Sequence, residues 1–149
     1  MRQHDILNVS NDTGLANVLA GDIELEDAIL PTPHPNMDFL PSGKLSAGVH
    51  GLFDNTRMID VLAMVRASYD AVVFDSPPVF GVSDTMVLMR EMDGVILVVE
   101  HRRYPKAVPI RARALIANLG VNLLGVVLNK INLRRDMTYY HCKAYDYAY

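Results

Sequence analysis

The stretch that most constrains this chain runs from residue 69 to residue 78, Tyr-Asp-Ala-Val-Val-Phe-Asp-Ser-Pro-Pro. The four consecutive apolar residues at positions 71–74 are typical of a short strand that is buried on both faces. Pro77 and Pro78 then end the strand, because proline cannot donate a hydrogen bond to a ladder. Asp75 is therefore expected at the carboxyl edge of a parallel sheet, where open α/β sheets bind ligands.

An apolar strand that ends in aspartate is also the Walker B pattern of nucleotide-binding proteins. In those proteins the carboxylate helps to hold Mg²⁺ on the nucleotide phosphates. The alternative is that Asp75 only accepts hydrogen bonds in a turn. The strand and the aspartate by themselves leave both interpretations open, since short motifs often match by chance.

Length and composition limit the class of protein. The chain has 149 residues, of which half are hydrophobic and 21% are charged, so it fits one globular domain with a sizeable core. A net charge of -3 gives no reason to expect nucleic acid or an anionic membrane as a partner. The lone cysteine, Cys142, suits a reducing compartment, and no apolar leader opens the chain. We therefore expect a cytoplasmic location.

Hydrophobic periodicity predicts alternating strands and helices. Helices are expected over residues 55–68, 83–89 and 108–119, and strands over residues 37–40, 71–74, 94–99 and 123–128. Residues 31–35 alternate proline with other residues and predict a stiff, extended connector. The first thirteen residues are polar and predict irregular structure. Strands that alternate with helices indicate an α/β fold, with a parallel sheet and flanking helices.

The end of the chain has a different composition. Five tyrosines fall within the last eleven residues: Tyr139, Tyr140, Tyr145, Tyr147 and Tyr149. They follow neither a strand nor a helix period. One interpretation is an aromatic tail that docks on the domain surface, and the other is a flexible substrate for tyrosine phosphorylation. We expect a domain over residues 1–137 and a tyrosine-rich tail over residues 138–149.

Several short motifs occur in a fixed order along the chain. They are Gly14-Leu15, Val18-Leu19-Ala20-Gly21, Leu40-Pro41-Ser42-Gly43, residues 70–78, Ser83-Asp84, Asp93-Gly94-Val95, residues 125–129 and the tyrosine cluster. Together with His4, this series resembles the bacterial tyrosine kinases of capsular and exopolysaccharide synthesis. Those kinases belong to the MinD/ParA-like branch of P-loop ATPases. The resemblance runs nearly from end to end.

The resemblance implies a MinD-like, Rossmann-like P-loop fold and a set of site residues. Asp75 matches the catalytic Walker B aspartate, which reaches Mg²⁺ through water. Asn129 matches the residue that hydrogen-bonds the adenine edge, with a turn residue at a strand end as the alternative. Arg103, like Arg102 before it, follows a strand at the ligand-facing edge and is placed to approach phosphate, unless it is only solvated. Asp84, at a helix start, either belongs to the site or only favours the helix dipole, and we favour the second interpretation.

Two parts of the family pattern do not occur in this sequence. There is no Gly-x-x-x-x-Gly-Lys phosphate loop, and there is no aspartate-bearing Walker A′ strand. Residues 46–53 replace the family's Pro-Pro-Asn-Pro segment, which puts its subunit contacts in question. By spacing from His4, Met1 falls just after the Walker A′ segment. The expected fold is therefore incomplete: strands 94–99 and 123–128 keep their pairing, and residues 71–74 lose both neighbours.

These observations leave three hypotheses for the function. The first is the C-terminal part of an ATP- and Mg²⁺-dependent tyrosine kinase that regulates polysaccharide synthesis and export, and is silent on its own. The second is a non-enzymatic regulatory protein whose tail is phosphorylated by a complete kinase, and the third is a fragment of another MinD-like ATPase. The expected partners are a membrane-bound polysaccharide co-polymerase or activator, the missing half of the kinase domain, or further copies of the chain. Any membrane association is expected at the inner face, through a partner.

Overall fold

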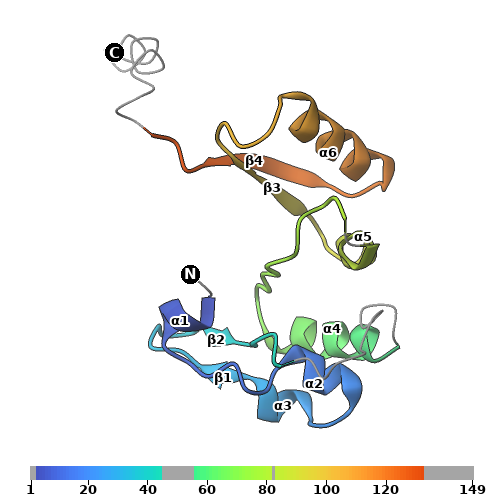
Figure 1. The fold of residues 1–149 in the computed structure, drawn as a ribbon. Helices are drawn as coiled ribbons and strands as arrows, with labels where there is room; N and C mark the ends of the chain where they lie inside the picture. Colours follow the sequence, from blue (N-terminus) through green and yellow to red (C-terminus); the bar gives the residue numbers. More distant parts are fainter. Residues whose placement is uncertain (1–2, 45–55, 82, 133–149) are drawn as a thin grey trace, which may run out of the picture. The chain divides into compact units, whose positions relative to one another are not determined.

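The computed structural model describes residues 3–44, 56–81 and 83–132 (Figure 1). The chain divides into two compact units, Met1–Ser76 and Pro77–Tyr149, and each is described by itself. Helices occur in both units, and a parallel strand pair occurs in the second. The predicted α/β class is confirmed.

The first unit is mainly helical. It contains α1 (Gln3–Leu7), α2 (Leu15–Ala20), α3 (Leu25–Ala28), β1 (Leu30–Pro31), β2 (Asp38–Phe39) and α4 (Thr56–Ser68). Helix α4 buries Met58, Val61, Leu62 and Val65, a spacing that places all four on one face. In the sequence Met58, Leu62, Val65 and Tyr69 recur at helical intervals, and the first three are buried, whereas Tyr69 lies just beyond the end of the helix. Helix α1 was not expected, because residues 1–13 show no apolar periodicity.

Helix α2 begins against the loop that follows β2. The N–H groups of Leu15 and Ala16 donate to the carbonyl oxygens of Pro41 and Ser42, at 2.8 and 3.0 Å. The first N–H groups of a helix have no partner within the helix, so this loop satisfies two of them. A side chain at Gly14 would overlap the Pro41 carbonyl oxygen. The contact therefore requires glycine at position 14.

A second glycine completes this junction. The Asn17 side chain accepts a hydrogen bond from the Gly14 N–H at 3.1 Å. Gly43 packs against the same amide oxygen of Asn17, with φ at +77°. That backbone conformation strains any residue with a Cβ atom. The motifs around Gly14 and Pro41, which are 27 residues apart in the sequence, are thus two sides of one contact.

Strands β1 and β2 form a small antiparallel hairpin. The hydroxyl of Thr32 donates to the Met37 carbonyl oxygen at 2.7 Å and closes the loop. Asn36 adopts the left-handed conformation, with φ at 60°, as asparagine does in tight turns. The predicted stiff connector over residues 31–35 is therefore wrong. The predicted strand over residues 37–40 is reduced to the two residues of β2.

Residues 71–74, the centre of the predicted Walker B strand, do not form a strand. The segment has no regular secondary structure, and Val73 is 93% exposed. The prediction of a strand is wrong because a strand needs a neighbour for its backbone groups, and β1 and β2, the strands described in this unit, pair only with each other. The segment is tied at its start, where the Tyr69 hydroxyl donates to Asp38 Oδ2 at 2.8 Å.

The second unit contains the long strands. It comprises α5 (Ser83–Arg90), β3 (Val95–Glu100), α6 (Ala107–Asn118) and β4 (Leu123–Asn129). All four predicted elements are confirmed, with ends within two residues of those expected. Strands β3 and β4 are parallel, with an irregularity between Val95 and Ile96, and the register ends with Glu100 opposite Asn129.

The two faces of strand β3 differ in burial. Helix α6 lies along the pair (Figure 1), and Met89, Leu97, Ala112 and Ile116 form a buried cluster between helix and sheet. On the opposite face Ile96 and Val98 are 57% and 59% exposed. Val127, the register partner of Val98, is 47% exposed. We call Ile96, Val98 and Val127 the uncovered face.

Candidate nucleotide-binding residues

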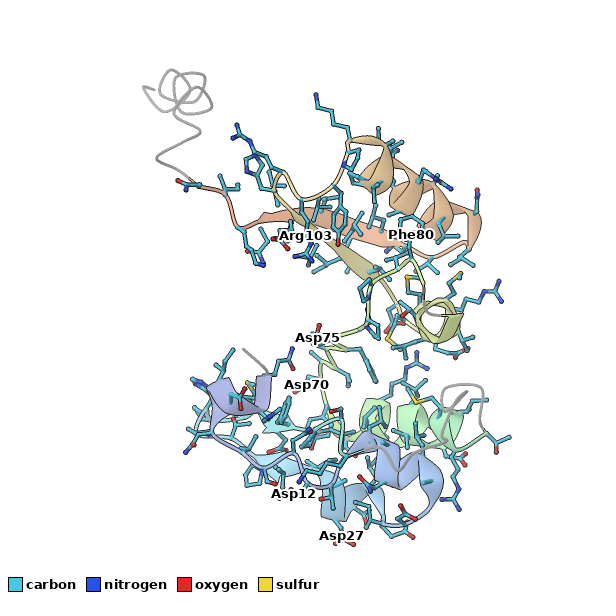
Figure 2. The ribbon with its side chains drawn as sticks, viewed as in Figure 1. Asp12, Asp27, Asp70, Asp75, Phe80 and Arg103 are labelled. Atoms are coloured by element: carbon cyan, nitrogen blue, oxygen red, sulfur yellow. The ribbon has the colours of Figure 1, made fainter. Side chains whose placement is uncertain are left out.

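Asp75 follows the irregular segment 71–74 in the first unit (Figure 2). The side chain is exposed, and its Oδ2 accepts a hydrogen bond from Gln3 Nε2 at 2.8 Å. Gln3 opens α1, so this bond joins the two ends of the described part of the unit. One carboxylate oxygen is thus held, and the exposed side chain can present the other to a ligand.

Asn129 and Glu100 end the two parallel strands of the second unit. They lie opposite each other in the register, so their side chains leave the same face of the sheet. The His101 N–H donates to the Asn129 carbonyl oxygen at 2.9 Å, which fixes the backbone at this edge. The side-chain Oδ1 of Asn129 accepts the N–H of Lys130 at 2.8 Å. Asn129 therefore lies at the strand end, as expected, with its amide oxygen already engaged.

Arg103 lies in the loop after β3 (Figure 2), where it contacts a carboxylate. Its Nη1 is 2.9 Å from Glu100 Oε2, and its guanidinium lies over the Tyr104 ring, 5.6 Å from the centroid. Lys130 Nζ is 3.2 Å from the other oxygen of Glu100. The hydrogen bonds from Lys130 and then from Arg103 lower the pKa of Glu100. A phosphate at Arg103 would have to compete with Glu100.

The structure says less about the other residues that the sequence analysis named. The five tyrosines proposed as phosphoacceptors, Tyr139, Tyr140, Tyr145, Tyr147 and Tyr149, lie outside the described residues. Asp84 falls in the first turn of α5, where the sequence placed it. Within the described ranges, no three or more His, Cys, Asp or Glu side chains gather into a metal-binding group. No helix in these ranges is long and apolar enough to cross a membrane.

Three residues around the candidate site were not singled out from the sequence. They are Gln3, Glu100 and Lys130. The signal for Glu100 and Lys130 was present, because both stand at the carboxyl ends of the predicted strands. Their pairing, however, depends on the register between the strands, and both strands are apolar along nearly their whole length, so no alternating pattern selects one register.

Comparison with known proteins identifies the family. The model of an AAA domain family matches residues 2–108. The chain belongs to this AAA domain family. The match includes Asp75 and Arg103 and ends before β4, so Asn129 lies beyond it.

The similar proteins of known name are bacterial tyrosine-protein kinases. The putative tyrosine-protein kinase CapB of Staphylococcus aureus is 27% identical over 93% of this chain and 61% of CapB. The tyrosine-protein kinase CpsD of Streptococcus agalactiae serotype III is 30% identical over 80% of this chain and 51% of CpsD. The chain thus spans between half and two thirds of the length of these relatives.

A solved kinase structure supports the same conclusion for the fold. The kinase domain of the Escherichia coli tyrosine kinase ETK aligns with a TM-score of 0.78 and 29% identity. The alignment covers 86% of this chain and 50% of that one. The resemblance to bacterial tyrosine kinases, first seen in the order of short motifs, is therefore confirmed.

Proposed function

We propose that this chain is part of a protein-tyrosine kinase that regulates capsular and exopolysaccharide synthesis and export. In this proposal it supplies the magnesium-facing carboxylate, the base-binding edge and the acceptor tyrosines. The observation that carries the proposal is the similarity to tyrosine-protein kinases over nearly the whole chain, with the family motifs in order. The domain extends over residues 1–137, and the tail over residues 138–149.

Asp75 fits the role of a magnesium-facing residue. Magnesium prefers oxygen ligands and keeps several of its waters, so one exposed carboxylate suffices for a contact through water. Asp75 offers such a carboxylate, held at one oxygen by Gln3. The ion, when bound with ATP, neutralises charge that develops on the transferred phosphoryl group.

The edge formed by Asn129 and Arg103 fits the nucleotide. An asparagine amide both donates and accepts, which matches the edge of adenine. Asn129 stands at the carboxyl end of β4, the usual ligand edge of a parallel sheet. Arg103 lies near Asn129, because Arg103 contacts the Glu100 carboxylate and Glu100 is opposite Asn129 in the strand register. Its guanidinium suits a phosphate oxygen once Glu100 releases it.

The reaction proposed for the full domain transfers the γ-phosphoryl group of ATP to a tyrosine. A bond forms between the phenolic oxygen and γ-phosphorus, the bond from γ-phosphorus to the bridging oxygen breaks, and ADP leaves. The phenolic proton passes to solvent or to a carboxylate. The tyrosines at positions 139–149 are the proposed acceptors. Each phosphate adds about 1.5 to 2 negative charges at pH 7, so successive phosphates repel one another.

Phosphoryl transfer also needs backbone N–H groups and a lysine around the phosphates. The 149 residues contain no Gly-x-x-x-x-Gly-Lys sequence. In our proposal a separate polypeptide segment supplies this loop, and the chain on its own neither binds ATP tightly nor phosphorylates itself. The same observation favours a second candidate function, a non-enzymatic protein that a complete kinase phosphorylates on its tail.

Two mixing experiments, each with a different partner protein, distinguish these two functions. Mixed with an intact relative and ATP, the chain should gain phosphate within residues 139–149, as mapped by mass spectrometry. Tyr104, which is 52% exposed, is the internal control. We expect that exposure alone does not make a tyrosine an acceptor, because its backbone must also be free to enter the active site of the kinase. Phosphate found only on Tyr69 or Tyr104 would contradict both candidates.

The second partner is a fragment of a relative that contains the phosphate loop and lacks acceptor tyrosines. If the chain is part of a kinase, this mixture phosphorylates the tail, and Asp75→Asn abolishes most of the signal. If the chain is only an acceptor, the mixture gives no phosphate with either variant. In both cases the proposed location is the cytoplasmic face of the membrane, reached through a co-polymerase partner.

A further inference from the structure

We propose that Glu100 is a positioning residue that presents the Asn129 amide to a purine base and withholds Arg103 and Lys130 from phosphate. This inference rests on the proposed base-binding role of Asn129. Glu100 itself touches no base. It acts through the two loops that follow β3 and β4.

The backbone places the two side chains together. Glu100 is opposite Asn129 in the last step of the parallel register, and the His101 N–H bonds the Asn129 carbonyl at 2.9 Å. Register partners in a parallel pair point to the same side of the sheet. The Glu100 carboxylate and the Asn129 amide therefore emerge on one face at the ligand edge.

Lys130 connects the carboxylate to the amide. Its N–H donates to Asn129 Oδ1 at 2.8 Å, and its Nζ lies 3.2 Å from Glu100 Oε1. Lys130 also adopts the left-handed conformation, with φ at 56°, which is unfavourable for a residue with a Cβ atom. The ion pair with Glu100 favours that conformation of Lys130, and the Lys130 N–H holds the Asn129 amide oxygen. The amide oxygen is thereby fixed, and the amide NH₂ is left to donate to a ring nitrogen.

The second oxygen of Glu100 holds the loop after β3. Arg103 Nη1 is 2.9 Å from Oε2, and the residue before it, Arg102, is also left-handed, with φ at 58°. Glu100 thus bridges two loops that each contain a strained residue. While the bridge holds, Glu100 engages two cations and offsets one of their two positive charges, which would otherwise attract phosphate.

Replacing Glu100 should therefore change two affinities in opposite directions. In Glu100→Gln the affinity for adenosine should fall about two- to fivefold, the range expected from an exposed ion pair. The affinity for inorganic tripolyphosphate should rise, because Arg103 and Lys130 are released. A general loss of structure would lower both affinities together. Glu26→Gln, which removes the same charge from exposed α3, is the matched control and should change neither.

The measurement is NMR of the full ¹⁵N-labelled chain, which detects millimolar binding. Without ligand, Glu100→Gln should shift the Asn129 side-chain NH₂ and the Lys130 backbone amide, and change the coupling constant that reports the Lys130 φ angle. Unchanged signals, or two affinities that fall together, would overturn the positioning role. If adenosine fails to shift Asn129 in the unaltered chain, the proposed base-binding function fails, and the ligand-free signals still decide whether Glu100 orients the amide.

Discussion

Two apolar runs in this chain look alike in sequence and differ in structure. Residues 71–74 and the apolar residues 95–99 of strand β3 are both short, rich in valine and followed by an acidic residue. Strand β3 pairs with β4 along its length, whereas residues 71–74 form no ladder, and Val73 is 93% exposed. The difference lies in the neighbour: β3 has a partner strand 23 residues later, and the 71–74 segment has none among the described strands of its unit.

The comparison shows that an apolar run predicts the capacity to form a strand. The ladder itself depends on a second strand, because backbone N–H and C=O groups need partners. In this chain two side-chain hydrogen bonds flank the unpaired run, from Tyr69 to Asp38 and from Gln3 to Asp75. Such bonds fix the ends of a segment and leave its middle open to solvent.

Hydrogen exchange should show the largest difference between the two runs. The Val72 and Val73 amides should exchange at nearly the rate of an unstructured peptide. Amides of β3 that face β4 should exchange at least about a thousandfold more slowly, since opening a packed ladder approaches the cost of global unfolding. Slow exchange at Val72, Val73 and Phe74 in the monomer would refute our account. Adding a fragment of a relative that contains its first two strands should slow these three amides.

Core truncation gives the next largest effect. Ile116 is fully buried against β3 and β4, so Ile116→Ala should lower the free energy of unfolding by about 2–5 kcal/mol. Val73→Ala removes an apolar side chain from the unpaired run and should lower the free energy of unfolding by less than about 0.5 kcal/mol. Urea denaturation followed by circular dichroism measures both. Equal losses would mean that Val73 is packed.

Adjacent valines of β3 test the two faces of one strand. Val99 packs against the buried cluster, and Val98 lies on the uncovered face. Val99→Thr should cost about 1 kcal/mol, at the low end for a hydroxyl placed in apolar surroundings. Val98→Thr should cost less than about 0.5 kcal/mol and reduce aggregation, which light scattering would report. A larger loss from Val98→Thr would show that its face is covered.

The smallest expected effect concerns the hydrogen bond from Tyr69 to Asp38, just before the unpaired run. Tyr69→Phe should cost about 0.5–1 kcal/mol by removing the hydrogen bond to Asp38. That bond raises the pKa of Tyr69, so its contribution is complete below the ordinary tyrosine pKa and is lost as the pH rises through the higher folded value. The difference in stability between the two proteins should therefore disappear at strongly alkaline pH. A difference that persists there would assign the effect to packing.

The parts of the fold that could be predicted are those with a local cause. The bounds of α4, α6, β3 and β4 follow from periodicity and from stop signals such as Gly120. The hairpin at Thr32 and Asn36 was missed because it depends on side-chain hydrogen bonds in the turn, which proline spacing conceals. The strand at residues 71–74 was overpredicted from its apolar run, although the expected loss of both neighbouring strands, which the structure bears out among its described strands, already removed the partners that it needs.

The candidate site residues also fall into two groups, those that could be placed from the sequence and those that depend on tertiary structure. Asn129 and Arg103 could be placed from the sequence, because each follows a strand whose direction was predicted. The part played by Glu100 could not, because it follows from the register that brings Glu100 opposite Asn129. Gln3, which holds Asp75 from 72 residues away, gives no local signal at all.

The junction at the start of α2 limits how this chain can vary. Gly14, Asn17 and Gly43 fill one small volume, and a side chain at either glycine would collide with backbone or with the Asn17 amide. Substitution is therefore disfavoured at both glycines, at Gly14 by the Pro41 backbone and at Gly43 by its left-handed φ. Among related sequences that keep this junction, both positions should remain glycine. A design that transplants α2 into another protein must carry the Pro41–Gly43 loop with it.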